Sequence, residues 1–386
     1  MFDASELEGI PHGLVKVFGG LEQRIFTDIV RRLKANAGEI TRSADWQIYR
    51  MYELGAASEE IKTAIRDALK LADDEVDRIY DAILAEDYAR MRSLYEKTGR
   101  ELLPYAENAW LQQLVEAIKS QTRDELYNIT GTLGVAASNK GRVNLVSLTQ
   151  YYTETLDGAV LDIASGAFDY NTVLRRTVRD LTNSGIRHID YESALGRPTS
   201  ARIDVAARRA IMTGVGQLTG QISERNAVDL GTDTYETSVH HGCRPEHLPW
   251  QGGWFTMAQL RSVCGYGDVA GLKGANCRHD FYPVIPGIDE PSYSAEELAR
   301  IREEEATPRE YMGKTYTAYE ATQHQRKLER TMRARRESIK LLEAGGADPE
   351  DITKERASYR AVSQEYTRFS AAMNIPEQRE RVRIIG

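Results

Sequence analysis

The sequence predicts a mainly α protein that carries one small α+β module. Over most of the chain, apolar residues recur every three or four positions, which is typical of amphipathic helices. Residues 240–279 depart from this pattern and concentrate histidine, cysteine, arginine, tryptophan and glycine. Beyond them the helical pattern returns with a high density of charge. We therefore expect an N-terminal helical bundle over 1–183, a central α+β module over 184–290, and a C-terminal antiparallel, basic helical hairpin with a tail over 291–386.

Length, charge and cysteine content restrict the class of protein. The chain has 386 residues, enough for two or three compact units, and its net charge of −8 argues against a protein that coats DNA over its whole surface. Cys243, Cys264 and Cys277 have no CxxC spacing and predict no secreted disulfide framework. There is no signal-peptide pattern, and no apolar run approaches the roughly 20 residues that span a bilayer. We expect a soluble protein made in a cytoplasm, without a membrane partner.

The first region reads as several helices joined by capped turns. One helix carries the apolar face Leu21, Ile25, Ile29 and Leu33 and ends at a break near residues 36–38. A second helix begins near Ser43, its N-cap residue, and is closed by Gly55, and Ser58 then caps a third. Residues 100–183 continue the helical periodicity, so we expect this region to be mainly helical as well.

The central module combines short strands with one helix. Residues 186–191 alternate loosely and precede a turn at 195–198, which predicts a small hairpin. The helix that follows contains Gly214, Gly216 and Gly220, and three glycines inside a helix predict that another backbone packs closely against it. Further strands are expected at Tyr235–Val239, around Trp254–Phe255 and through Phe281–Ile285.

The last region reads as a helical hairpin. Ser294 and Glu297 match a capping box. A long helix then runs to Gly345–Gly346, where it stops, and Asp348–Pro349 begins the next helix. Two antiparallel helices follow from this pattern, with an extended tail after Pro376.

The first helix of this hairpin carries a local excess of positive charge. Between residues 325 and 340 seven basic residues face two acidic ones. A solvated helix face is the default interpretation, and contact with DNA phosphates or with an acidic protein partner is the alternative. The residues concerned are Arg326, Lys327, Arg330, Arg333, Arg335, Arg336 and Lys340.

The His240–His279 stretch allows a zinc site without requiring one. Cys243, His247, Cys277 and His279 are four suitable ligands, but their C-x3-H and C-x-H spacings differ from those of common zinc modules. The alternative, which we favour, is that the cysteines are small buried hydrophobes and the histidines hydrogen-bond the loop. We therefore expect no cofactor, with the metal content left open.

Two other kinds of chemistry receive less support. A cysteine with His240, His247 or His279 could form a nucleophilic pair, but proximity in sequence does not establish the necessary hydrogen bond. The span Gly265–Gly274 has glycines and a lysine without matching a phosphate-binding pattern, so a flexible loop is the simpler interpretation. We expect neither a catalytic residue nor a small-molecule substrate.

The same stretch carries a family resemblance. Its motif core, together with Ala306–Tyr311, Tyr319–Gln323 and Val205–Val215, resembles the phage minor capsid protein 2 family, which is distantly similar to the Mu-F-like head morphogenesis proteins. The likeness extends over nearly the whole chain. The motif core consists of His240, Gly242, Arg244, Pro245, His247, Trp250, Gln251, Asn276, Cys277, Arg278 and His279.

The resemblance implies a minor structural protein of a tailed-phage or prophage head, associated with the portal and acting in head assembly or DNA packaging or ejection. Portal protein, other head proteins and phage DNA are the implied partners, the virion is the implied location, and no catalytic reaction is implied. The family commonly has a small residue such as alanine at the position of Cys243, which speaks against a four-ligand zinc site. His247, Cys277 and His279 could then form a hydrogen-bonded clasp, with Arg244 and Arg278 donating to loop carbonyls and Trp250 as its lid.

Two other classes of function remain as alternatives. One is a zinc-dependent or Cys–His hydrolase acting on head proteins or the cell wall, which a bound metal with an open coordination position would favour. The other is a nucleic-acid-binding factor outside the virion, which strongly salt-dependent DNA binding would favour.

Overall fold

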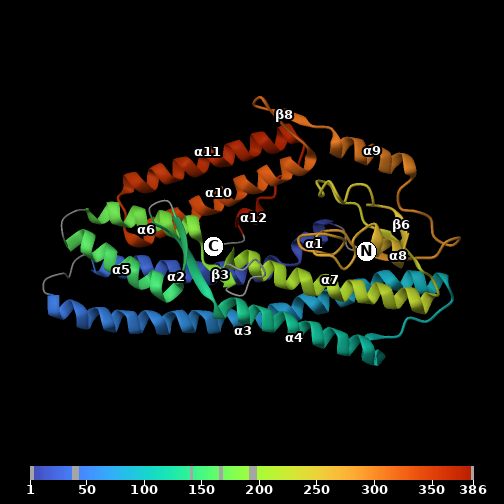
Figure 1. Cartoon of the computed structure of the whole chain (residues 1–386), viewed down its shortest axis with the longest axis horizontal. Coiled ribbons are helices and arrows are strands. Elements are labelled where there is room, and N and C mark those ends of the chain that lie inside the picture. The colour runs from blue at the N-terminus through green and yellow to red at the C-terminus, as the bar shows by residue number, and fades with distance from the viewer. Residues whose placement is uncertain (1–3, 37–42, 140–141, 165–167, 191–197, 384–386) are drawn as a thin grey trace.

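The computed structural model describes residues 4–36, 43–139, 142–164, 168–190 and 198–383. The protein is elongated, and long helices run side by side along its length (Figure 1). The predicted mainly α class with a small α+β module is confirmed. The long axis is formed by α2 (His12–Asn36), α3 (Ser43–Lys97), α4 (Ala109–Gly131) and α7 (Ile203–Leu230). The shorter α1 (Ala4–Gly9), α5 (Leu148–Ala164) and α6 (Tyr170–Ser184), and the 3-10 turn Tyr105–Glu107, complete the helices of this part.

The helix α3 is one continuous element, which corrects the prediction of separate helices. It passes through both Gly55 and Ser58 without interruption. A single glycine in a helix costs only about 1 kcal/mol. The buried stripe of α3 includes Ala64, Ala68, Ala72 and Val76, and its packing against α2 outweighs that cost.

One hydrophobic core runs along the body. The expected apolar face of α2 is fully buried, with Leu21, Ile25, Ile29 and Leu33 each 3% exposed or less. The core continues through α4, α6 and α7 and reaches Leu341 at the far end of the chain's long basic helix. Side chains from all three expected regions therefore contribute to one core.

A four-stranded antiparallel sheet has the strand order β2-β1-β3-β4, and its first two strands lie in the region expected to be mainly helical. The hairpin of β1 (Leu133–Asn139) and β2 (Arg142–Ser147) was not predicted. Its strands are short and lack clear alternation, so the helical periodicity on both sides dominated the prediction. The expected second hairpin is confirmed as β3 (Arg187–Asp190) paired with β4 (Thr199–Arg202). Residues 195–197 of its expected turn lie outside the described residues.

The glycines of α7 allow close contacts, as expected, although mostly with side chains. The position of a Cβ on Gly214 would lie 1.9 Å from the hydroxyl of Tyr80, and on Gly220 2.7 Å from that of Tyr266. Only Gly216 faces a backbone, the carbonyl oxygen of Lys273 at 3.5 Å. Through these contacts α7 packs against both the helical body and the small module.

The small module is a three-stranded antiparallel sheet in the order β6-β5-β7. Its strands, β5 (Thr234–Thr237), β6 (Trp254–Thr256) and β7 (Phe281–Val284), confirm the three expected positions. With α8 (Met257–Ser262) they enclose a separate apolar cluster around Phe281 and Trp250. The module lies at one end of the molecule, against the end of α7 (Figure 1).

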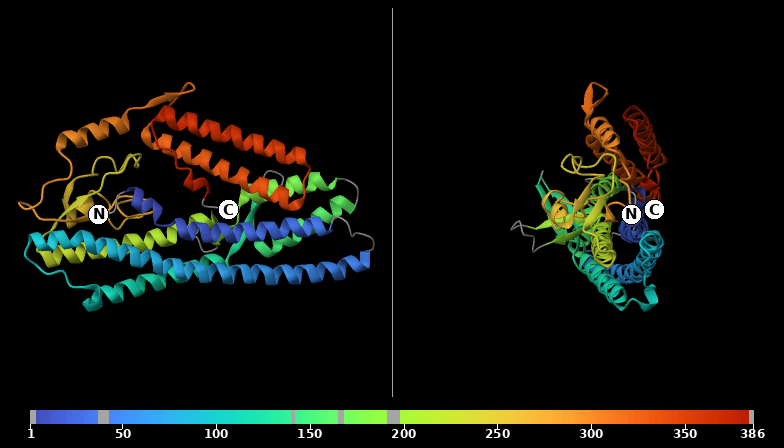
Figure 2. Two further views of the ribbon diagram at one scale, coloured as in Figure 1. Left: turned by 180° about the vertical axis from the view of Figure 1, so that it is seen from behind. Right: turned by 90° about the vertical axis from the view of Figure 1, so that its right-hand side faces the viewer.

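The C-terminal part is the predicted helical hairpin. The capping box at Ser294 begins α9 (Ala295–Ala306), and a hairpin of β8 (Arg309–Tyr311) and β9 (Lys314–Tyr316) leads into the long helices. These are α10 (Ala318–Gly345) and α11 (Pro349–Met373). The pair packs along one side of the body through contacts of α10 with α2 and α6 (Figure 2).

The tail after Pro376 is not simply extended, which corrects the prediction. It forms a short helix, α12 (Glu380–Arg383), which packs on α10. Val382 is buried between the hairpin helices, and Arg381 reaches carboxylates on α1 and α10. These contacts are made with distant segments, so no local pattern in the tail reveals them.

Candidate functional site

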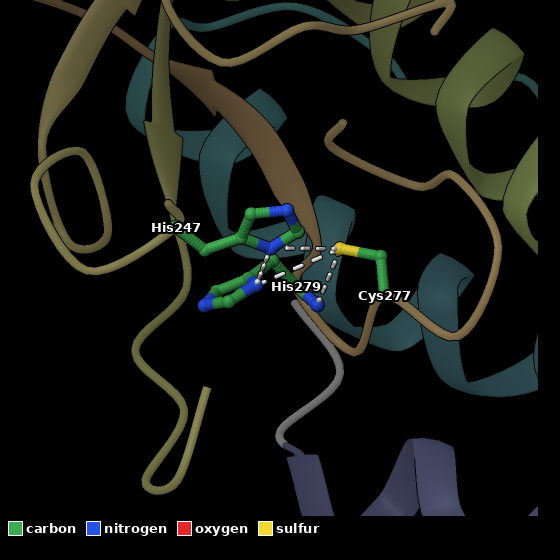
Figure 3. A group of neighbouring side chains, drawn as sticks. All are labelled: His247, Cys277 and His279. Atoms are coloured by element: carbon green, nitrogen blue, oxygen red, sulfur yellow. Dashed lines mark hydrogen bonds between the residues drawn. The ribbon is translucent and has the colours of Figure 1, made fainter. Parts of the chain in front are cut away.

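His247, Cys277 and His279 come together although thirty residues separate the first from the second. Their side chains point toward one another from two different loops (Figure 3). The Nδ1 atoms of the two histidines are 3.4 Å apart, and the sulfur of Cys277 lies 3.8 Å from the Nδ1 of His247 and 3.6 Å from that of His279. We call these three residues the His–Cys–His triad.

The outer ring nitrogens of the triad have fixed partners. Nε2 of His247 lies 2.9 Å from the carbonyl oxygen of Ala270, which can only accept a hydrogen bond. Nε2 of His279 lies 3.2 Å from Oε1 of Gln251, and the backbone N–H of His240 donates to that same oxygen. Both Nε2 atoms therefore carry the proton, so both Nδ1 atoms present a lone pair to the centre of the triad.

The two histidines of the triad are buried against an aromatic side chain, whereas Cys277 is half-buried. His247 and His279 are each 3% exposed, and Trp250 lies over both rings, with centroid distances of 4.8 and 4.7 Å. Burial lowers the pKa of both imidazoles, so both are neutral at pH 7. Burial also raises the pKa of the Cys277 thiol, against the opposing effect of a hydrogen bond from the backbone N–H of His279.

Arg244 fastens the loop that lies next to the triad. Its guanidinium donates to the carbonyl oxygen of Ala270 at 3.1 Å and to that of Ala275. These are the loop-carbonyl contacts that the clasp hypothesis gave to Arg244. The carbonyl of Ala270 thus receives hydrogen bonds from both Arg244 and His247, which joins the loop after β5 to the connection that leads into β7.

Two motif residues serve the backbone of these loops. Asn276 has a φ of 59°, in the left-handed region that asparagine tolerates better than most residues. Gly242 has a φ of 66°, and a Cβ there would lie 2.5 Å from the methyl group of Thr322 on α10. The backbone conformation at these two positions therefore explains why asparagine and glycine occur there. Neither residue needs a chemical role of its side chain.

Among the described residues, the partner of Arg278 is a carboxylate and not a loop carbonyl, which corrects the clasp hypothesis on this point. It forms an ion pair of 2.8 Å with Glu8 of α1. Arg326 on α10 lies 3.4 Å from the same carboxylate, and Arg381 of α12 also contacts it. Arg381 further pairs with Glu329. Glu8 therefore ties the motif, α10 and α12 to α1.

The remaining residues of the stretch lie around the triad. Cys243 is buried, but its sulfur is not part of the group of donor atoms that the described residues bring together, so the four zinc ligands that the sequence allowed are not assembled. The ring of His240 stands 5.6 Å from that of His279, and burial lowers the pKa of His240 to about 4. Pro245 is exposed beside Arg244.

The glycine-rich span Gly265–Gly274 is a series of turns rather than a phosphate loop. Its lysine, Lys273, pairs with the buried Asp280 and donates to Thr219 on α7, so its charge is already neutralised. Lys273 and Asp280 are both nearly buried, with side-chain exposures of 7% and 5%. Lys273 thereby anchors the span to the helical body, and the hydroxyl of Tyr266 does so as well by donating to Glu224 of α7 at 2.8 Å.

The basic face of α10 is largely occupied by intramolecular contacts. Arg326 meets Glu8, Arg333 pairs with Asp204 at 3.0 Å, and Arg335 pairs with Glu355 at 2.9 Å. Arg336 donates to the carbonyl of Val382 at 2.6 Å, and Lys340 also interacts with neighbouring residues. Of the seven predicted residues, Lys327 and Arg330 are exposed and the other five are half-buried. The sequence could not show this, because most of the acidic partners lie outside α10.

Two carboxylates that hold the motif in place carry no recognisable signal in the sequence. Glu8 pairs with Arg278, and Glu305 of α9 accepts hydrogen bonds from the backbone N–H of Gly242 and from His241 at 2.9 Å. The hydrogen bond with Glu305 raises the pKa of His241. Neither carboxylate is near the motif in sequence, and no local signal distinguishes it from other surface glutamates.

A cavity of about 480 Å³ lies away from the triad, between α4, α7 and the β3–β4 hairpin. His188, Asp190, Glu125 and Arg209 are among its lining residues, and none of the motif residues is. The absence of a small-molecule substrate remains a prediction.

The comparisons with known proteins identify the family. No curated protein and no solved structure matches the chain. Among the described residues, no helix is long and apolar enough to cross a membrane. The model of the family described as phage minor capsid protein 2 matches residues 2–370, which include the triad, the motif loops and nearly all of the α10–α11 hairpin. The chain therefore belongs to the phage minor capsid protein 2 family and has a structural role in the phage head, as a component of the virion.

Proposed function

We propose that this head protein acts at the portal, where it binds portal protein and neighbouring head proteins during head assembly and DNA packaging or ejection. The family match over residues 2–370 carries the proposal. The contacts that the motif residues make also support the proposal. Gly242, Asn276, Arg278 and Arg244 shape loops and bind neighbouring segments, as expected of a scaffold that presents surfaces to partners.

One end of the helical body offers a surface suited to a protein partner. Leu103 and Trp110 line a shallow cavity beside Arg225 of α7, and the Arg225 guanidinium lies over the Trp110 ring. Trp110 is 38% exposed and Val228, one turn beyond Arg225, is 73% exposed. Exposed apolar and aromatic side chains next to an arginine are characteristic of protein interfaces. We assign the portal-binding contact to this end of α4 and α7.

The test is photo-cross-linking in assembling particles. A photoreactive amino acid replaces Trp110 in one phage and Tyr359, on the remote helix α11, in a matched control. We expect the protein in purified particles at a few copies, and a portal adduct from position 110 alone. Equal adducts from both positions, or none from position 110, would overturn the assignment of the surface. Absence of the protein from particles at all stages would overturn the portal proposal.

We propose DNA contact for fewer residues than the sequence indicated. Lys327 and Arg330 are the exposed members of the predicted set, and two phosphate contacts are too few for strong binding on their own. If this face meets DNA, it does so while other proteins hold it in place. Replacing both residues with glutamine should then reduce packaged DNA without changing the copy number of the protein in the particle.

The hydrolase alternative has one observation in its favour, the contact of Cys277 with two imidazoles. The burial of His247 and His279 under Trp250 opposes it, since a substrate must reach the sulfur. Cleavage of head proteins or cell wall by the purified protein, abolished in Cys277→Ser, would support this alternative.

A further inference from the structure

The geometry points to a zinc-class metal site in the His–Cys–His triad, with Nδ1 of His247, Nδ1 of His279 and Sγ of Cys277 as its three protein ligands. Two nitrogens and one sulfur form the borderline-soft donor set that Zn²⁺ prefers. These are the three residues whose donor atoms all lie within 4.8 Å of one another in the described part of the chain.

The spacing of the three atoms fits a common central ion. Zinc binds imidazole nitrogen at about 2.0–2.1 Å and thiolate sulfur at about 2.3 Å, so ligand atoms of a tetrahedral ion stand about 3.3–3.6 Å apart. The triad shows 3.4 Å between the nitrogens and 3.6 and 3.8 Å between sulfur and nitrogen. A shift of a few tenths of an ångström in one side chain would complete the match.

The hydrogen bonds around the triad also favour a cation at its centre. Both Nε2 protons are donated outward, to Ala270 and Gln251, so neither Nδ1 carries a proton. The thiol of Cys277 has one proton and can satisfy only one of the two nitrogens. The other Nδ1 would face a second lone pair at 3.4 Å in a buried site, which is unfavourable. A metal ion accepts both lone pairs and the thiolate together.

The surroundings are those of a supported metal site. A histidine ligand normally donates its other N–H to a carbonyl or an amide or carboxylate oxygen, which fixes the ring. His247 does so to the carbonyl of Ala270 and His279 to Oε1 of Gln251, which the backbone N–H of His240 orients. Trp250 covers both rings and shields them from water.

The site would join two loops of the small module. His247 lies in the loop between β5 and β6, whereas Cys277 and His279 lie just before β7. A metal would lock together the same loops that Arg244 joins by hydrogen bonds. Three protein ligands leave the fourth position to a water molecule, because the sulfur of Cys243 is outside the described donor group. A water ligand alone would also suit the hydrolase alternative. Both histidines are buried and Trp250 packs against their rings, which hinders a substrate from reaching the metal, so we infer a structural role.

The test uses the full chain, purified without chelator and analysed for metal. We expect about one zinc ion per chain. After removal of the metal, Co²⁺ is added as a spectroscopic probe. The wild-type chain should show the visible bands of tetrahedral Co²⁺ and a near-ultraviolet thiolate charge-transfer band. Co²⁺ bound without a thiolate band, or no stoichiometric binding of Zn²⁺ or Co²⁺, overturns the proposal without requiring any variant.

Matched variants then identify the ligands. Cys277→Ala should lose the thiolate band, whereas Cys264→Ala should keep it, because Cys264 belongs to the same apolar cluster against which Cys277 packs but lies outside the triad. His247→Ala should lose metal, and His240→Ala should retain it. Cys243→Ala distinguishes a metal site with three protein ligands from one with four. An unchanged band intensity supports the three-ligand site, and a weaker band overturns it. Chelator should lower the melting temperature of the wild-type chain but not of Cys277→Ala.

Discussion

Glu8 and Arg278 stand 270 positions apart in the chain and form an ion pair of 2.8 Å. Glu8 lies on α1, and Arg278 lies between two members of the His–Cys–His triad. The same carboxylate also meets Arg326 and Arg381. One acidic side chain therefore holds together the first helix, the motif, the basic helix and the tail.

Replacing Glu8 should destabilise the whole protein. Glu8→Gln leaves three partly buried guanidiniums without their shared carboxylate, and the loss of one partner from a buried pair costs about 3 kcal/mol or more. We expect this decrease in the free energy of unfolding, measured by chemical denaturation. Glu59→Gln is the control, because Glu59 pairs with Lys62 on an exposed surface and its replacement should change stability little. Equal effects of both changes would contradict the central role of Glu8.

The destabilisation expected from a Cβ at position 242 has two parts, one from the backbone and one from contact with Thr322. Gly242→Ala introduces a left-handed alanine, which costs about 1–2 kcal/mol, and a methyl group that collides with the γ-methyl of Thr322. Thr322→Ser removes the γ-methyl and keeps the hydroxyl. We therefore expect the double variant to be more stable than Gly242→Ala and less stable than Thr322→Ser. Strictly additive effects in denaturation would show that the two residues do not touch.

The conformation of Asn276 predicts that alanine and glycine at this position affect stability differently. At a φ of 59°, Asn276→Ala should lower stability by about 1 kcal/mol, whereas Asn276→Gly should be nearly neutral. Asn128, exposed on α4, provides the control, because alanine is the better helix former there and Asn128→Ala should not destabilise. An unchanged melting temperature for Asn276→Ala would argue against the clasp of loops around the triad.

A buried cluster beneath α10 should make stability depend on pH. Glu22, Asp204 and Glu337 gather around two guanidiniums, those of Arg202 and Arg333. Burial, together with the charge of Glu22, raises the pKa of Glu337 to about 8, and burial also raises the pKa of Glu22. One oxygen of Glu337 is buried and receives no hydrogen bond from the described residues, as fits a carboxyl group that keeps its proton.

The sign of this effect follows from the raised pKa. The folded protein binds the proton of Glu337 more tightly than the unfolded chain, so the stability that this proton provides is complete below about pH 4.5 and is lost as pH rises toward about 8. Glu337→Gln mimics the protonated form. It should match the wild type at pH 5, exceed it in stability at pH 8.5, and flatten the pH profile between these values. Glu343→Gln, which alters an exposed pair with Arg356, should leave the profile unchanged.

Several features of the fold could be predicted because they depend on short windows of sequence. The apolar face of α2, the capping box at Ser294 and the glycine stop after α10 each depend on residues within a few positions of one another. The three strands of the small module were also placed correctly. The continuity of α3 was missed, because local signals at Gly55 and Ser58 suggested breaks that the packing of α3 against α2 overrides.

The sequence by itself determined the helical class, the hairpin before the central helix, the three strands after it, the C-terminal helices and the residues of the motif stretch. Periodicity, caps and residue chemistry are local properties. Tertiary structure alone decided that His247, Cys277 and His279 converge without Cys243, that Arg278 meets Glu8 and not a loop carbonyl, and that most arginines of α10 are already paired. Such contacts join segments far apart in the chain. They are selected by the packing of the whole body, which no short stretch of sequence specifies.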